Sequence, residues 1–120
     1  MDAEIIWFKD CSYKNKHLVG GKCSSLGELH GIAKRIGFSI GDGFAITTNL
    51  YDEFIKYNEL ECTIVKMLDE IDPTNIKQLE EKSMELRKIV SSAKLSDEHH
   101  EVMISSYNQL SMLYGRENME

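Results

Sequence analysis

The chain has 120 residues, which is enough for one domain with a real core, and 42% of its residues are apolar. Its formal net charge of −6 argues against a general nucleic-acid surface, and it has no apolar run long enough for a membrane span. The excess acid lies in residues 59–120, because residues 1–58 carry seven basic and seven acidic side chains. Three widely spaced cysteines without a metal-binding pattern indicate reduced thiols in a cytoplasmic protein.

Two short strands are predicted near the start of the chain. Runs of β-forming residues predict strands over 4–9 and 43–47, and a polar loop follows the first of them. Between the strands, apolar residues at helical spacing predict a helix over 22–36, with Gly37 as its C-cap. The apolar stripe of this helix is expected to consist of Leu26, Leu29, Ala33 and Ile36.

The rest of the chain is predicted to be helical, over about 48–57, 59–71, 74–93 and 96–114. The expected N-caps of three of these helices are Thr48 or Asn49, Thr74 and Ser96. This pattern predicts an α+β fold with few strands and a majority of helices. We expect a single domain over residues 1–120, with a strand-containing part over 1–57 and a helical part over 58–116.

Residues 18–29 combine a glycine turn, a lysine and the start of a helix. Gly20 and Gly21 let the backbone adopt a positive φ and come close to a ligand. The start of a helix adds free N–H groups and a partial positive charge, and Lys22 adds a full one. These are the parts of a phosphate site, although a glycine turn with a solvated lysine is the alternative interpretation.

This stretch is not a P-loop, because Lys16 and Cys23 stand where that motif has glycine and serine or threonine. Ser24 and Ser25 lie in the first turn of the predicted helix, where their hydroxyls either donate to a phosphate or cap the helix. Gly27 in the middle of a helix costs about 1 kcal/mol relative to alanine. That cost indicates the close approach of another element or of a ligand.

Several blocks of the sequence, in this order, resemble a known enzyme family. The blocks are Val19-Gly20-Gly21-Lys22, Ser25-Leu26-Gly27-Glu28-Leu29, Gly43-Phe44-Ala45-Ile46-Thr47-Thr48 and Tyr51 with Phe54. They look like the start of phosphoenolpyruvate synthase, and the pattern is shared with pyruvate phosphate dikinase and the rifampicin phosphotransferases. The resemblance implies the first part of an ATP-grasp-like nucleotide-binding domain in which the motif lysine, here Lys22, contacts ATP phosphate.

The nucleotide-binding residues expected on this resemblance are Gly20, Gly21, Lys22, Ser24, Ser25, Thr47 and Thr48. For Thr47 and Thr48, which follow the second strand, a strand-end or capping role is an equal alternative. The family implies ATP and Mg²⁺ as cofactors, yet no residue here is a convincing metal ligand. We assign no catalytic residue in this chain.

The resemblance implies a transferase that converts ATP, pyruvate and water into phosphoenolpyruvate, AMP and phosphate. In that family the second ATP-binding strand, the metal carboxylates, the phosphohistidine domain and the pyruvate-binding barrel come later in the chain. We therefore expect an N-terminal fragment that is inactive alone, partners the remainder of the same polypeptide and reaches pyruvate only through domains absent here. The alternatives are a non-catalytic nucleotide-binding or regulatory module, and the N-terminal part of a rifampicin phosphotransferase.

Overall fold

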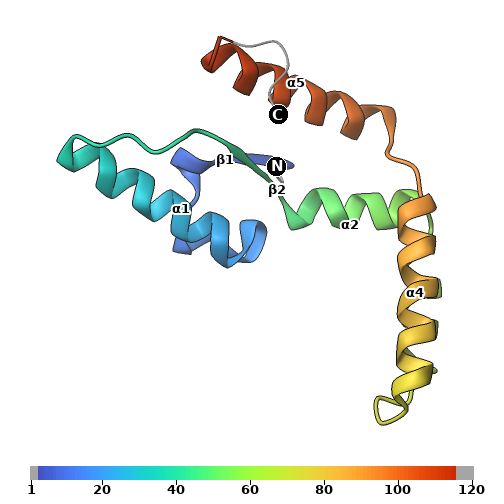
Figure 1. Ribbon diagram of the computed structural model, residues 1–120. Helices are drawn as coiled ribbons and strands as arrows, with labels where there is room; N and C mark the ends of the chain where they lie inside the picture. The colour runs from blue at the N-terminus through green and yellow to red at the C-terminus, as the bar shows by residue number, and fades with distance from the viewer. Residues whose placement is uncertain (1–2, 116–120) are drawn as a thin grey trace. The chain divides into compact units, whose positions relative to one another are not determined.

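The computed structural model describes residues 3–115 (Figure 1). In chain order its elements are β1 (Ile5–Trp7), the 3-10 turns η1 (Phe8–Asp10) and η2 (Tyr13–Asn15), α1 (Lys16–Ile36), β2 (Phe44–Ile46), α2 (Thr48–Tyr57), α3 (Glu61–Asp69), α4 (Ile76–Ser92) and α5 (Asp97–Leu113). Two short strands and a majority of helices confirm the predicted α+β class. No helix in this range combines the length and the apolar character that crossing a membrane requires.

β1 and β2 pair antiparallel in a two-stranded sheet, with Trp7 opposite Phe44. The rings of these two residues pack against each other, with their centroids 5.4 Å apart. Beyond the ladder, the Phe8 N–H donates to the Gly43 carbonyl at 2.9 Å. Both predicted strands are confirmed, but each is shorter than predicted. The first ends early because the chain turns into η1 directly after Trp7.

The chain divides into two compact units. Unit 1 consists of Met1–Asp52 and Asp97–Glu120, and unit 2 consists of Glu53–Ser96. Unit 1 therefore contains the sheet, α1 and α5, and unit 2 contains α3 and α4. All the nucleotide-binding residues expected from the sequence belong to unit 1.

Unit 1 depends on two glycines that touch neighbouring residues. A Cβ built on Gly27 of α1 would lie 1.9 Å from the carbonyl oxygen of Cys11, and one built on Gly43 would lie 2.3 Å from the Phe8 ring. Real Cβ atoms do not approach other atoms this closely, so these contacts need a residue without a side chain. The close approach that Gly27 indicated is confirmed, and the neighbour is the backbone of Cys11.

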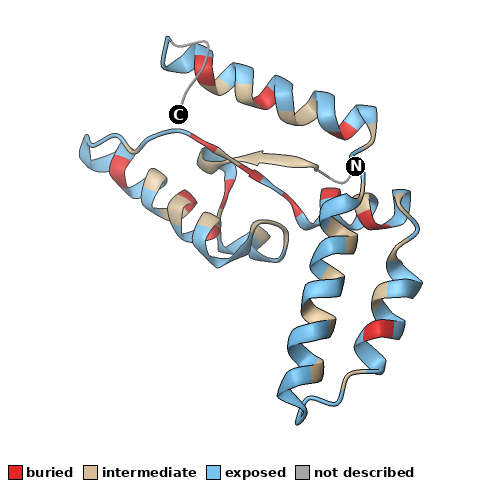
Figure 2. Cartoon of the chain, turned by 45° about the vertical axis from the view of Figure 1, so that its right-hand side comes forward, coloured by how far each residue is buried: buried red, intermediate tan, exposed pale blue. Residues whose placement is uncertain are grey.

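The side of α1 that packs differs from the stripe predicted. Ser24, Gly27 and Ala33 are buried, whereas Leu29 is 51% exposed and Ile36 is 64% exposed. Figure 2 shows buried positions along α1, with broad exposed stretches between them. The prediction of an apolar packing stripe is therefore wrong in part. The Cys11 segment packs at Gly27, so small residues define the contact side of the helix.

α5 is joined to the rest of unit 1 by polar contacts at its two ends. The Asp42 N–H donates to the Tyr114 hydroxyl at 2.7 Å, just after the helix ends. Near its start, His99 Nε2 lies 3.6 Å from the Glu4 carboxylate. These contacts place α5 beside the N-terminal strand and the loop that leads into β2.

In unit 2, the side-chain amide of Asn58 makes two hydrogen bonds to the backbone of Lys94. Its Nδ2 donates to the Lys94 carbonyl at 2.9 Å, and its Oδ1 accepts from the Lys94 N–H at 3.1 Å. The pair links the end of α2 to the residues after α4. Apolar burial in this unit centres on Ile55 and Met67.

The N-cap of α4 is Asn75, whose Oδ1 accepts from the Gln78 N–H at 3.1 Å. The prediction that Thr74 caps this helix is wrong. The Thr74 hydroxyl donates instead to the Asp72 carboxylate at 2.6 Å, because the two residues form a local turn before the helix begins.

Candidate functional site

Gly20 interrupts α1 near its start. Its φ of 81° and ψ of 174° are not helical, so a short first turn from Lys16 is separated from the long helical run that follows. A Cβ at this position would meet no atom within 4 Å, so the backbone conformation, and not crowding, favours glycine here. The predicted helix over 22–36 is confirmed, with Gly37 in the left-handed conformation as its C-cap, but it is preceded by one extra turn.

Two lysines accompany this break. Lys22 follows Gly21 directly and is exposed. The Lys16 Cε lies 3.8 Å from where a Cβ of Gly21 would stand, so the Lys16 side chain runs over the same glycine. Residues 11–27 contain no aspartate or glutamate, so no acidic side chain of this stretch offsets the two ammonium groups. The site therefore combines a helix start with two cations.

Sequence reasoning missed Lys16 as a site residue. The sequence predicts a polar loop after the first strand, and the approach of Lys16 to Gly21 depends on the turn that precedes the break. The absence of acidic residues over 11–27 is the signal that could have identified it.

The two serines after Lys22 occupy different surroundings. Ser24 is fully buried, and its hydroxyl donates to the Gly21 carbonyl at 2.9 Å. That hydrogen bond closes the first turn after the break. Ser25 is exposed on the same turn.

Thr47 is buried and lies at the junction of β2 and α2. Its hydroxyl donates to the Ala3 carbonyl at 2.6 Å and accepts from the Leu50 N–H at 3.4 Å, which makes it the N-cap of α2. The prediction that Thr48 or Asn49 caps this helix is therefore wrong. The helix begins one residue earlier than that prediction allows, because the strand ends directly before Thr47.

Thr48 is exposed, and its hydroxyl donates to the His17 carbonyl at 3.2 Å. His17 lies in the first turn of α1, just before the break. The fold thus brings the end of the second strand to the glycine–lysine stretch. Of the residues expected at the site, Gly20, Gly21, Lys22 and Ser25 lie at the break or directly after it, and Thr48 is hydrogen-bonded to the turn before it.

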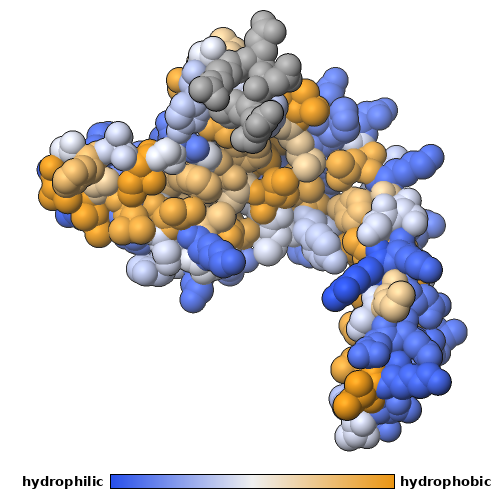
Figure 3. All heavy atoms as spheres, in the orientation of Figure 1, coloured by the Kyte–Doolittle hydropathy of each residue, from blue (hydrophilic) through white to orange (hydrophobic). Residues whose placement is uncertain are grey.

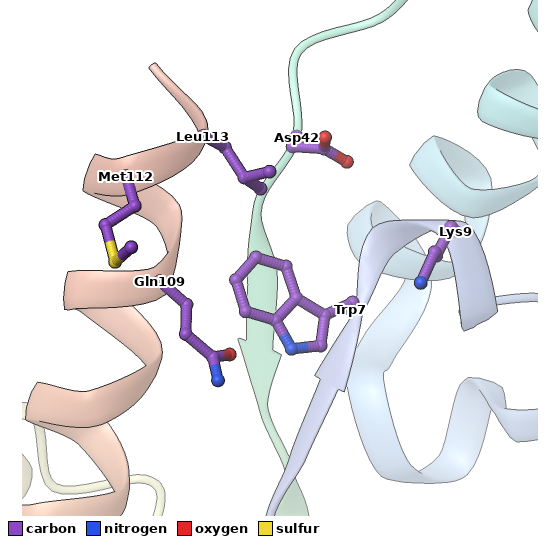
Figure 4. Close-up of a pocket in the computed structure, with 6 residues that line it drawn as sticks. All are labelled: Trp7, Lys9, Asp42, Gln109, Met112 and Leu113. Atoms are coloured by element: carbon purple, nitrogen blue, oxygen red, sulfur yellow. The ribbon is translucent and has the colours of Figure 1, made fainter. Parts of the chain in front are cut away.

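Unit 1 also has a hollow of about 480 Å³ between α5 and the sheet, shown in Figure 4. The residues that line it are Trp7, Lys9, Asp42, Gln109, Met112 and Leu113. The Trp7 ring reaches from β1 toward the side of α5 that carries Gln109. None of the nucleotide-binding residues expected from the sequence lines this hollow.

Residues 16–119 match the family described as "Pyruvate phosphate dikinase, AMP/ATP-binding domain". The match covers most of the chain and includes the break, both lysines and Thr48. The chain therefore belongs to the pyruvate phosphate dikinase AMP/ATP-binding domain family.

Curated relatives carry the name phosphoenolpyruvate synthase. The protein from Helicobacter pylori is 31% identical over 110 residues, which are 92% of this chain and 14% of that protein. The one from Aquifex aeolicus is 29% identical over 112 residues, or 93% of this chain and 13% of the relative. The one from Escherichia coli is 26% identical over 107 residues, or 89% of this chain and 14% of the relative. The chain spans about one seventh of the length of these relatives.

Proposed function

We propose that unit 1 supplies the phosphate-binding part of an ATP site in a phosphotransferase of the phosphoenolpyruvate synthase type. The observation that supports this most strongly is the positive-φ break at Gly20, which stands at the start of a long helix between Lys16 and Lys22. Membership of a family described as an AMP/ATP-binding domain supports the choice of nucleotide over other anions.

In this proposal Lys22 binds a phosphate through its ammonium group, and the backbone of Gly20 and Gly21 approaches the phosphate oxygens. Lys16, which lies over Gly21, supplies a second cation. The helix start and the absence of acid over 11–27 favour a polyanion at this place.

The four hydroxyl residues take two kinds of role. Ser25 and Thr48 are exposed, so their hydroxyls are the ones we assign to the nucleotide. Ser24 and Thr47 are buried and already hydrogen-bonded within the fold, so we assign them a positioning role. Ser24 fixes the turn after the break. Thr47, through its own hydrogen bonds, fixes the backbone that leads into Thr48.

The chemistry of the site residues does not fit a resident Mg²⁺. That ion prefers oxygen ligands, carboxylates above all, and residues 11–27 contain no carboxylate. We therefore assign no metal ligand in the glycine–lysine stretch and derive no step through a metal.

The complete enzyme, in this proposal, is a cytoplasmic transferase that makes phosphoenolpyruvate, AMP and phosphate from ATP, pyruvate and water. Its nucleotide-binding domain is ATP-grasp-like, and this chain is one part of it. Phosphoryl transfer needs further cations and a metal to neutralise charge, so the remainder of the polypeptide completes the site and reaches pyruvate. Alone, the chain is expected to bind ATP weakly and to show no turnover.

The test is ATP binding by the 120-residue chain, followed through the phosphorus NMR signals of the nucleotide. A partial site should bind at roughly millimolar affinity, about −4 kcal/mol. Lys22→Ala is expected to weaken binding about tenfold, because one charge-assisted contact contributes roughly 1.4 kcal/mol.

Lys34→Ala is the matched control, because Lys34 is an exposed lysine in the last turn of the same helix. It should leave the affinity unchanged within a factor of two. Equal weakening by the two substitutions would mean that ATP responds only to net charge, which would contradict the proposed site.

A further inference from the structure

Cys11 packs against α1 at Gly27, one helical turn from Cys23. A Cβ built on Gly27 would stand 2.7 Å from the Cys11 Cβ, so the Cys11 side chain lies against α1 at that position. Cys23 is one turn earlier on the same helix, and residues four apart on a helix have Cβ atoms about 5–6 Å from each other. Disulfides need about 3.5–4.5 Å between their Cβ atoms, so forming one here requires the backbone of the Cys11 segment to shift along α1 toward Cys23.

The two sulfur atoms also influence each other electrostatically. Burial raises the pKa of the Cys11 thiol above its ordinary value of 9.0, and the neighbouring Cys23 and Asp10 raise it further. Such an effect decays with distance, so it is a second indication that the thiols are close. Cys11 is only 3% exposed, and its Sγ donates weakly to the Ile6 carbonyl at 3.9 Å.

The two thiols differ in access to solvent. Cys23 is half-buried, so a small oxidant can reach it, whereas Cys11 is covered. An oxidised Cys23 therefore meets a neighbouring thiol that is shielded from other reactants. Cys62, the third cysteine, is exposed in unit 2 and serves as an internal comparison.

We propose that Cys11 and Cys23 form a disulfide site that responds to hydrogen peroxide. The Cys23 thiolate attacks one peroxide oxygen, the O–O bond breaks, hydroxide leaves and a sulfenic acid forms. The Cys11 sulfur then attacks the Cys23 sulfur, the S–O bond breaks, and hydroxide leaves with the Cys11 proton as water. Overall, two thiols lose two electrons and two protons to one peroxide, which yields one disulfide and two water molecules.

The cross-link would close a covalent ring that contains the Gly20 break and Lys22. The turn before the break would then be tied to the helix after it, which restricts local opening. Amide hydrogen exchange over residues 16–22 should slow at least threefold in the oxidised chain and return on reduction. The formation of the disulfide itself does not depend on the proposed nucleotide site.

Peptide mapping tests the proposal directly, because trypsin separates the three cysteines into peptides 10–14, 23–34 and 57–66. The reduced chain is treated with hydrogen peroxide, free thiols are alkylated, and the digest is analysed without reduction. We expect a species with the summed mass of peptides 10–14 and 23–34 less two hydrogens, in a monomeric chain. Peptide 57–66 should be recovered alkylated.

Two variants that each replace one cysteine show whether the linked species contains Cys23 and not Cys62. Cys23→Ser must abolish the linked species, and Cys62→Ser must leave its yield unchanged. Linked peptides that contain Cys62, a cross-link only between two chains, or further oxidation of Cys23 without any link would each overturn the proposal. Cys23 is half-buried, so Cys23→Ser is expected to fold, and the Trp7 fluorescence of the reduced variant checks this.

Discussion

In unit 1, segments far apart in the chain are joined by backbone hydrogen bonds and glycine contacts, whereas unit 2 consists of consecutive helices joined by side-chain polar contacts, among them those of Asn58 and Gln78. The Thr47 N–H donates to the Glu4 carbonyl at 3.0 Å, and the Gly27 contact with Cys11 has no tolerance for a side chain. Unit 2 relies on Asn58 and on the contact of α3 with α4. The surfaces differ as well: Figure 3 shows hydrophobic residues gathered over α1 and β2, and mostly hydrophilic ones along α4.

This difference indicates where sequence changes matter for function. In unit 1 a few positions, such as Gly20, Gly27 and Thr47, fix the backbone around the candidate site, so each is difficult to replace. In unit 2 the exposed helix surfaces offer many positions where substitution should change little.

Gly27→Ala should have the largest effect. The added Cβ would collide with the Cys11 carbonyl, which is backbone and cannot turn aside, so we expect a loss of about 3 kcal/mol or more in the free energy of unfolding. Urea unfolding followed by the fluorescence of Trp7, the single tryptophan, measures it in unit 1. Gly31→Ala, which meets nothing within 4 Å on the same helix, should instead stabilise by about 0.5–1 kcal/mol. Equal effects of the two changes would contradict the packing described here.

Thr47→Val keeps the side-chain shape and removes the buried hydroxyl. The variant loses the hydrogen bond to Ala3 and the cap of α2, which should cost about 2 kcal/mol in unfolding free energy. The same urea experiment applies. Thr48→Val, which removes an exposed hydroxyl, should cost no more than about 0.5 kcal/mol. A larger effect at Thr48 than at Thr47 would reverse the roles assigned to them.

Asn58→Ala tests the two hydrogen bonds between Asn58 and Lys94 in unit 2. Both hydrogen bonds to Lys94 are lost, and the partly solvated site should limit the cost to about 1 kcal/mol. Amide hydrogen exchange should increase at Lys94 and at the end of α2. Asn58→Asp keeps the acceptor for the Lys94 N–H and should show about half of the effect. Unchanged amide hydrogen exchange in Asn58→Ala would show that the hydrogen bonds of Asn58 to Lys94 do not stabilise unit 2.

The smallest expected effect is a pH dependence at Asp72. The Thr74 hydroxyl and then the Thr74 N–H hydrogen-bond its carboxylate and lower the pKa of Asp72 below 3.8. Because the folded-state pKa is the lower one, this contribution is present above the unfolded value and is lost as pH falls below about 3.8. Asp72→Asn should remove this part of the acid sensitivity, as urea midpoints at pH 3 and pH 6 would show. An identical pH dependence in wild type and Asp72→Asn would contradict the assignment.

Features that follow local rules could be predicted from the sequence. Gly37 as a C-cap, the strands and the importance of Gly27 all depend on residue type and short spacing. The packing side of α1 and the approach of Lys16 to Gly21 could not be predicted, because both depend on where the chain before the helix folds back. The cap at Thr47 was missed because the exact end of β2 decides it, and strand ends are poorly defined by sequence patterns.

The central claim is that the turn after Gly20 binds phosphate, and amide-resolved NMR of the chain during an ATP titration tests it most directly. The account predicts shifts at residues 20–25 and at Thr48, nearly absent in Lys22→Ala and unchanged in Lys34→Ala. The amide signals of α3 and α4 should not shift. Shifts concentrated in unit 2, or shifts around Gly20 that persist in full in Lys22→Ala, would contradict it.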